Sequence, residues 1–117
     1  MAQPRPTIST HVLDLETGAP AASFPVALFR LGDDGQPELL AEAETDVDGR
    51  IDSLLEGDLR PGSYQLIFDL AVYLADADRD PGFFENLAVG FRIEDSDRGY
   101  HVPLLVTPYG LSTYRGS

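Results

Sequence analysis

Two histidines are the side chains of this sequence best suited to acid–base chemistry. His11 and His101 are its only histidines, and each falls within a segment that we interpret as a strand. An imidazole titrates near neutral pH, so a pair brought together by the fold could act as general base and general acid. The alternative is two unrelated residues, one of them partly buried and hydrogen-bonded. The sequence leaves both readings open, because only the fold can bring such distant residues together.

Arg50 is the third candidate, and it follows Asp48-Gly49 at the start of a short predicted strand. An arginine packed in a sheet interior costs desolvation free energy unless it meets an anion or a carbonyl oxygen. Its planar guanidinium would suit the carbonyl oxygens of a bound substrate. The alternative is an arginine at a strand end whose side chain reaches water.

The last residues form the fourth group. Chain ends are usually frayed, but here Tyr114, Arg115 and Ser117 follow an apolar run over residues 102–106. We expect this terminal segment to dock against the site of His11, Arg50 and His101 and to contribute Tyr114, Arg115 and Ser117 to it. An exposed polar edge strand is the alternative.

Other chemistries have weaker support in the sequence. No motif has the spacing of a zinc site, and the chain has no cysteine. A catalytic triad could be drawn from Ser9 or Ser112 with His11 and Asp14, but no Gly-x-Ser-x-Gly motif is present. The acidic run 76–80 lacks the glycine and glutamate of a calcium loop. We therefore expect no metal and no cofactor.

Composition narrows the possible partners and the compartment. The formal net charge is −12, which repels a phosphate backbone and argues against nucleic acid. No apolar run approaches the roughly 20 residues of a membrane helix, and the first residues do not resemble a secretory signal. The lack of cysteine fits a reducing compartment. We expect a cytoplasmic protein with no membrane partner.

The elements that must position these residues are short strands. Alternating apolar residues, bounded by turns rich in Gly, Pro and Asp, predict a single all-β domain over residues 1–117, with residues 1–6 flexible. One short helix is expected at about 70–77 because that segment is rich in Ala and Leu. The pattern predicts an eight-stranded antiparallel β-sandwich, with strands over 7–15, 24–31, 38–45, 51–54, 64–70, 87–93, 99–107 and 111–117.

Several turn motifs resemble the prealbumin-like sandwich pattern: Thr17-Gly18-Ala19-Pro20, Asp46-Val47-Asp48-Gly49 and Leu59-Arg60-Pro61-Gly62-Ser63-Tyr64. That pattern specifies a fold and leaves function open. A more specific resemblance comes from Ser9-Thr10-His11-Val12-Leu13-Asp14, Asp48-Gly49-Arg50, Tyr100-His101-Val102-Pro103 and the terminal Tyr114-Arg115-Gly116-Ser117. Together they resemble the 5-hydroxyisourate hydrolases, the transthyretin-related enzymes of urate degradation.

This resemblance implies a hydrolase that opens the lactam of 5-hydroxyisourate to give 2-oxo-4-hydroxy-4-carboxy-5-ureidoimidazoline. It implies a homotetramer built as a dimer of dimers, with active sites at the mouths of the central channel. The implied catalytic residues are His11, Arg50, His101 and Ser117, and the implied substrate-binding residues are Arg50, Tyr114 and Arg115, with no metal. Residues added after Ser117 are expected to damage activity far more than stability.

Two positions depart from the family pattern. Gly99 stands where the family often has a histidine, and Leu111 stands where it often has an aromatic residue. We expect Leu111 to alter packing at the channel wall. Two other functions remain as alternatives: a transthyretin-like carrier of a small aromatic ligand and a structural prealbumin-like module.

Overall fold

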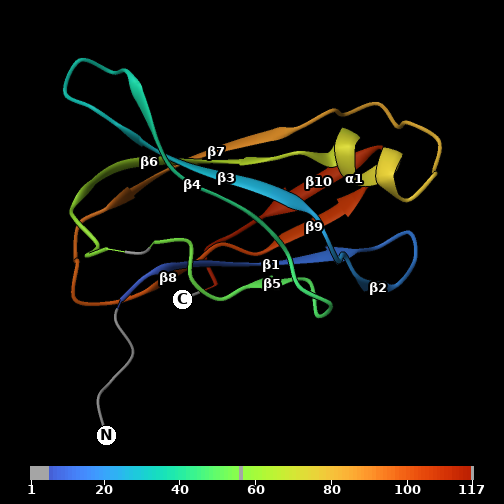
Figure 1. Cartoon of the computed structure of the whole chain (residues 1–117), viewed down its shortest axis with the longest axis horizontal. Coiled ribbons are helices and arrows are strands. Elements are labelled where there is room, and N and C mark those ends of the chain that lie inside the picture. The colour runs from blue at the N-terminus through green and yellow to red at the C-terminus, as the bar shows by residue number, and fades with distance from the viewer. Residues whose placement is uncertain (1–5, 56, 117) are drawn as a thin grey trace, which may run out of the picture.

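Two β-sheets, packed face to face, form the protein (Figure 1). The structure is a computed structural model that describes residues 6–55 and 57–116. The larger sheet has the order β10-β9-β1-β2, and β5 and β8 also pair with β1. Its strands are β1 (Ile8–Asp14), β2 (Ala19–Pro20), β5 (Arg50–Ile51), β8 (Tyr100–His101), β9 (Leu104–Thr107) and β10 (Gly110–Thr113). The smaller sheet has the order β4-β3-β6-β7, with β3 (Pro25–Leu31), β4 (Pro37–Glu44), β6 (Gly62–Phe68) and β7 (Leu87–Ile93).

Alternation along the strands separates a buried face from an outer face in each sheet. In β6, Tyr64, Leu66 and Phe68 point into the core, which confirms the predicted period of two. In β1 the even-numbered residues from Ile8 to Asp14 are buried, whereas Ser9, His11 and Leu13 are only half-buried. Ser9, His11 and Leu13 therefore share the outer face of the larger sheet. The two-sheet sandwich predicted from the sequence is confirmed.

The strands differ from the prediction in several places. β5 covers Arg50–Ile51 where 51–54 was predicted, and β10 covers Gly110–Thr113 where 111–117 was predicted. The expected strand 99–107 divides into β8 and β9 around Val102-Pro103, because proline has no N–H to donate to a sheet. Both pieces still pair with β1, in parallel. Ala19–Pro20 forms the short strand β2 where the sequence indicated only a turn. The described residues therefore contain ten strand segments where eight strands were predicted.

The single helix of the described chain, α1 (Leu70–Asp76), agrees with the predicted one. Its first turn is capped by the Asp69 carboxylate, which accepts a hydrogen bond from the Val72 N–H at 3.1 Å. Leu70 and Leu74 are buried in the core. In Figure 1 the helix lies at the end of the sandwich opposite β8. No helix in the described ranges is long and apolar enough to span a bilayer.

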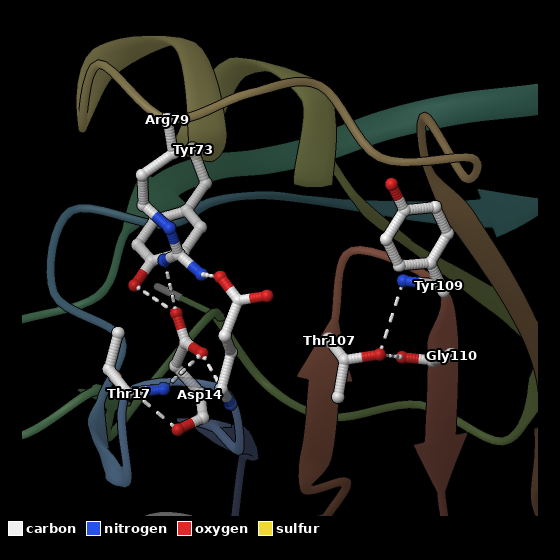
Figure 2. Close-up of polar contacts among 8 residues, drawn as sticks. Asp14, Thr17, Tyr73, Arg79, Thr107, Tyr109 and Gly110 are labelled. Atoms are coloured by element: carbon white, nitrogen blue, oxygen red, sulfur yellow. Dashed lines mark hydrogen bonds and ion pairs between the residues drawn. The ribbon is translucent and has the colours of Figure 1, made fainter.

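Asp14, the last residue of β1, is a buried carboxylate with a full set of partners (Figure 2). It accepts hydrogen bonds from the Tyr73 hydroxyl at 2.9 Å, from the Arg79 guanidinium, and from the backbone N–H groups of Glu16 and Thr17 at 3.0 and 3.2 Å. Burial alone would raise the pKa of Asp14, but the hydrogen bonds from Arg79, Tyr73 and Thr17 outweigh it and hold that pKa below its ordinary value. The contacts attach the end of β1 to α1 and to the loop after it.

Candidate active site

β1 brings the two histidines and Arg50 onto one surface. His11 lies opposite Arg50 of antiparallel β5, and Ser9 lies opposite His101 of parallel β8. Residues opposite one another in neighbouring strands project from the same face of a sheet. Because Ser9 and His11 are on the outer face of β1, all four side chains belong to that face. We call Ser9, His11, Arg50 and His101 the outer-face cluster; the structure thus brings together three residues that the sequence singled out.

The tautomer of His11 follows from its hydrogen bond. Its Nε2 lies 2.9 Å from the carbonyl oxygen of Asp48. A carbonyl oxygen can only accept, so Nε2 carries the proton that it donates. In the neutral ring Nδ1 then has the lone pair, and it is the nitrogen left for chemistry.

The surroundings of His101 favour the neutral form of its imidazole. Burial lowers the pKa of His101, and the positive charges of Arg50 and His11 lower it further, while Asp52 acts in the opposite direction. A pKa below the ordinary 6.5 leaves the imidazole unprotonated at neutral pH. His101 is therefore able to accept a proton there.

Arg50 is exposed at the start of β5. The desolvation cost considered from the sequence does not arise in the single chain. Its guanidinium is available to a ligand lying over the outer face, beside His11. Its charge also reaches His101, as the lowered pKa of that imidazole shows.

The terminal segment returns to His101 after β10 ends at Thr113. The Thr113 hydroxyl donates to the carbonyl oxygen of Pro103 at 2.7 Å, and the Gly116 N–H donates to the carbonyl oxygen of His101 at 2.8 Å. A Cβ atom on Gly116 would lie 2.6 Å from Cδ2 of His101, so only glycine fits against this ring without movement. The predicted docking of the end is thus visible up to Gly116, whereas Ser117 lies outside the described residues.

Arg115 and Tyr114 line the edge of the same region. The Arg115 guanidinium lies 5.3 Å from the centre of the Tyr100 ring, and Arg98 lies 5.6 Å from it. Arg115 makes no ion pair with a carboxylate of the described chain, and the Tyr114 side chain is exposed. A cavity of about 230 Å³ opens here, lined by Val89, Phe91, Arg92, Tyr100, His101, Val102, Thr113, Tyr114 and Arg115.

The two departures from the family pattern lie in different surroundings. Leu111 pairs with buried Val106 and packs against the core. Its effect on the packing of a channel wall stays a prediction. A Cβ atom on Gly99 would lie 3.3 Å from the carbonyl oxygen of Thr7. A larger residue at position 99 would therefore need a small local shift.

Ser9, Asp52 and Tyr100 are parts of this region that the sequence did not single out for it. Ser9 contacts His101 through its hydroxyl, and Asp52 raises the pKa of that imidazole. The Tyr100 ring makes cation–π contacts with two arginines. Of these three residues, only Ser9 could have been assigned to the site from the sequence. Its position two residues before His11 in a strand puts both on one face.

The arrangement is suited to activating a water molecule. A neutral imidazole can take its proton, and a guanidinium beside it can stabilise developing negative charge. Among residues 6–55 and 57–116, no group of three or more His, Asp and Glu side chains could hold a metal ion. The described site therefore offers acid–base chemistry from its own side chains.

Comparisons with known proteins find similar chains and similar structures. A family model described as "HIUase/Transthyretin family" matches residues 8–116. The "5-hydroxyisourate hydrolase 2" of Rhizobium meliloti (strain 1021) is 44% identical over 115 residues, covering 94% of this chain and 95% of its own length. The structure of Klebsiella pneumoniae 5-hydroxyisourate hydrolase has a TM-score of 0.84 at 38% identity, over 96% of this chain and 99% of that one.

A third similar structure is sea bream transthyretin in complex with thyroxine, with a TM-score of 0.85 at 28% identity, covering 92% of each chain. The fold therefore matches this thyroxine-bound transthyretin as closely as it matches the hydrolase, but the sequence identity is higher to the hydrolases. Given the family match over nearly the whole sequence, the chain belongs to the HIUase/Transthyretin family.

Proposed function

We propose that the protein hydrolyses 5-hydroxyisourate, opening its lactam to 2-oxo-4-hydroxy-4-carboxy-5-ureidoimidazoline in urate degradation. The relatives named as 5-hydroxyisourate hydrolases support this reaction. The observation that carries it is the outer-face cluster, in which two imidazoles and a guanidinium from three strands share one surface. A protein that only bound an apolar ligand would gain nothing from placing a half-buried imidazole beside a guanidinium and a second imidazole.

The proposed reaction is addition of water to the lactam carbonyl. Nε2 of His101 takes a proton from water while the water oxygen bonds to the carbonyl carbon. The carbonyl oxygen becomes negative, and the guanidinium of Arg50 stabilises it. The carbon–nitrogen bond then breaks, and the departing ring nitrogen receives the proton. We assign His11 to the same proton network, through its free Nδ1.

The terminal segment completes the proposed site. Tyr114 and Arg115 bind substrate beside the cavity at His101. The Arg115 guanidinium packs against the Tyr100 ring and makes no ion pair with a carboxylate of the described chain, so its charge is available to the substrate. We assign Ser117 to orienting the water or an imidazole. The close contact of Gly116 with the His101 ring supports this assignment.

We further propose that four copies assemble, as a dimer of dimers, in the cytoplasm. Two features support the assembly. The edge strands β7 and β10 have no partner on their free sides within the described chain, and such edges invite pairing with another copy. The outer-face cluster also lies open in the single chain, whereas a closed site would exclude bulk water. The absence of cysteine supports a reducing compartment.

The test is to generate 5-hydroxyisourate from urate with urate oxidase and to follow its ultraviolet decay with and without the protein. We expect catalysed decay, and we expect His11→Ala, Arg50→Ala and His101→Ala each to lower kcat/KM by about 100-fold or more with an unchanged circular dichroism spectrum. A tag added after Ser117 should lower the rate more than the same tag before Met1.

Unchanged decay in the presence of folded wild-type protein would refute the hydrolase. Saturable binding of an aromatic ligand without turnover would instead favour the transthyretin-like carrier. A monomer with neither binding nor turnover would favour the structural module.

A further inference from the structure

The side chain of Ser9 contacts the imidazole of His101 directly. The two residues are register partners in the parallel pair of β1 and β8, and Ser9 Oγ lies 2.9 Å from His101 Nδ1. The hydroxyl makes no other hydrogen bond to residues 6–55 and 57–116. Ser9 is half-buried on the outer face. Its hydroxyl is therefore dedicated to this one ring nitrogen.

The backbone around His101 fixes where the ring sits. The Val102 N–H donates to the carbonyl oxygen of Ser9 at 2.9 Å, and the Gly116 N–H donates to the carbonyl oxygen of His101 at 2.8 Å. Gly116 also covers the Cγ–Cδ2 edge of the ring so closely that a Cβ atom would clash with it. With Nδ1 facing Ser9 and Cδ2 facing Gly116, Nε2 is the nitrogen that remains for a reacting molecule.

We propose that Ser9 is a positioning residue whose Oγ accepts a hydrogen bond from Nδ1–H of His101 and so keeps the Nε2 lone pair free to act as the base. The proposal deepens the proposed hydrolase function and rests on it. Ser9 itself neither gains nor loses a proton in the reaction.

The accepting role follows from the proton count of the base step. Before the step, a base at Nε2 requires the tautomer that carries its proton on Nδ1. After the step, the imidazolium carries protons on both nitrogens. Nδ1–H is present in both states, so a hydroxyl that accepts from it stabilises the ring throughout. A hydroxyl that donated to Nδ1 would leave Nε2 protonated and unable to act as the base.

His11 and His101 differ in which ring nitrogen carries the proton. The carbonyl oxygen of Asp48 holds the proton of His11 on Nε2, which leaves Nδ1 for chemistry. Ser9 does the opposite for His101. The two rings therefore offer different nitrogens to the surface they share, and the site does not contain two equivalent bases.

The charged groups that face His101 are the same in a serine variant and in the wild-type protein. His11 on β1, Arg50 on β5 and Asp52 after β5 shift the pKa of His101. Arg92 on β7 and Arg115 on the terminal segment line the cavity beside it. Removal of the Ser9 hydroxyl leaves all of them in place. A change in His101 can then be attributed to the lost acceptor.

The experiment combines ¹⁵N NMR of the histidine rings with steady-state kinetics on 5-hydroxyisourate, using the full chain and the variants Ser9→Ala, Ser9→Thr and Ser63→Ala. In the wild type we expect a protonated Nδ1 and an unprotonated Nε2 for His101 above its pKa. Ser9→Ala should mix the two tautomers, lower the pKa of His101 because the imidazolium loses an acceptor, and reduce kcat by about 10- to 100-fold with KM changed by less than about twofold.

Ser9→Thr keeps a hydroxyl and should restore the tautomer and most of kcat. Ser63→Ala removes an exposed strand serine from the other sheet and should change nothing. A wild-type His101 protonated on Nε2, or a Ser9→Ala variant with unchanged tautomer and kcat, would overturn the proposal. A wild type that shows the Nδ1–H signature but does not accelerate decay supports the Ser9 contact and overturns the hydrolase function.

Discussion

At the scale of single residues, the charges around His101 set its readiness to accept a proton. The positive charges of Arg50 and His11 add to burial in lowering the pKa of His101, and the carboxylate of Asp52 opposes them. Arg50 would therefore act twice in the proposed site. It would stabilise the oxyanion, and it already helps keep the nearby imidazole neutral.

We predict that Arg50→Gln and Asp52→Asn shift the pKa of His101 in opposite directions. Loss of the positive charge should raise that pKa toward the ordinary 6.5, whereas loss of the carboxylate should lower it further. Titration of the His101 ring protons by NMR measures both shifts. Shifts of the same sign would contradict this account of the site.

The same two variants should shift the pH dependence of kcat/KM in opposite directions. A general base works when it is unprotonated, so the acid limb of kcat/KM should move to higher pH in Arg50→Gln and to lower pH in Asp52→Asn. Because Asp52 does not contact substrate in the proposed mechanism, Asp52→Asn should keep the plateau value of kcat/KM within about threefold of the wild type. Arg50→Gln should lose most of its rate at every pH.

The sequence identified His11, Arg50 and His101 because their types are rare in this acidic chain, so each one carries information. Ser9 was named as a possible nucleophile and as part of the motif around His11, but not as a partner of His101, because the two residues lie 92 positions apart. The fit of Gly116 against an imidazole depends on a distance that no local pattern encodes. Residue type can be read from a sequence, but contacts across the sheet require its register.

At the scale of elements, β1 organises the site because β2, β5, β8 and β9 all pair with it. Its far end is held by the Asp14 contacts with Tyr73 and Arg79, shown in Figure 2. At about 3.3 Å per residue, Asp14 lies roughly 17 Å along the strand from Ser9. These contacts therefore stabilise the strand without touching the chemistry.

We predict that Arg79→Met lowers the free energy of unfolding by about 2–3 kcal/mol, because it leaves the Asp14 carboxylate buried with the Tyr73 hydroxyl and backbone N–H groups as its only donors. The folded-state pKa of Asp14 is lowered, so the contribution is present above its ordinary 3.8 and is lost as the pH falls through the folded value. Urea unfolding at pH 7 and at roughly pH 3 should show the wild-type advantage shrinking in acid.

Arg92→Met is the matched control for this prediction. Arg92 pairs with Glu94 at 3.9 Å, and both side chains are largely exposed, so the change should cost less than about 0.5 kcal/mol. Equal losses for the two arginine variants would show that burial of Asp14 does not matter.

The elements themselves were largely predictable, and the exceptions have physical causes. The strand Leu87–Ile93 and the helix follow from local alternation and propensity. The break at Val102-Pro103 was missed because the apolar run continues through it, while the hydrogen-bond ladder does not. The terminal residues leave the sheet at Thr113 because their backbone bonds to His101 instead, a contact between two distant segments.

At the scale of the whole molecule, the outer face of the larger sheet combines the polar cluster with apolar residues. Leu13 and Leu105 are register partners beside His11, and neither belongs to the core or packs against it. In a single chain their side chains would remain partly in water. Burying such a pair against another copy recovers about 25 cal/mol for each Å² of apolar surface covered.

We predict that Leu105→Glu prevents the proposed assembly while the chain still folds. Light scattering on the wild type should give about 51 kDa, four times the 12.7 kDa of one chain, and the variant should fall to a dimer or a monomer. Activity per chain should drop with it, because a site left open to water loses electrostatic stabilisation. Ile67→Glu, on the outer face of the four-stranded sheet, should keep the wild-type mass. A wild type that is monomeric and fully active would refute the role of assembly, since the outer-face cluster would then work without a second copy to cover it.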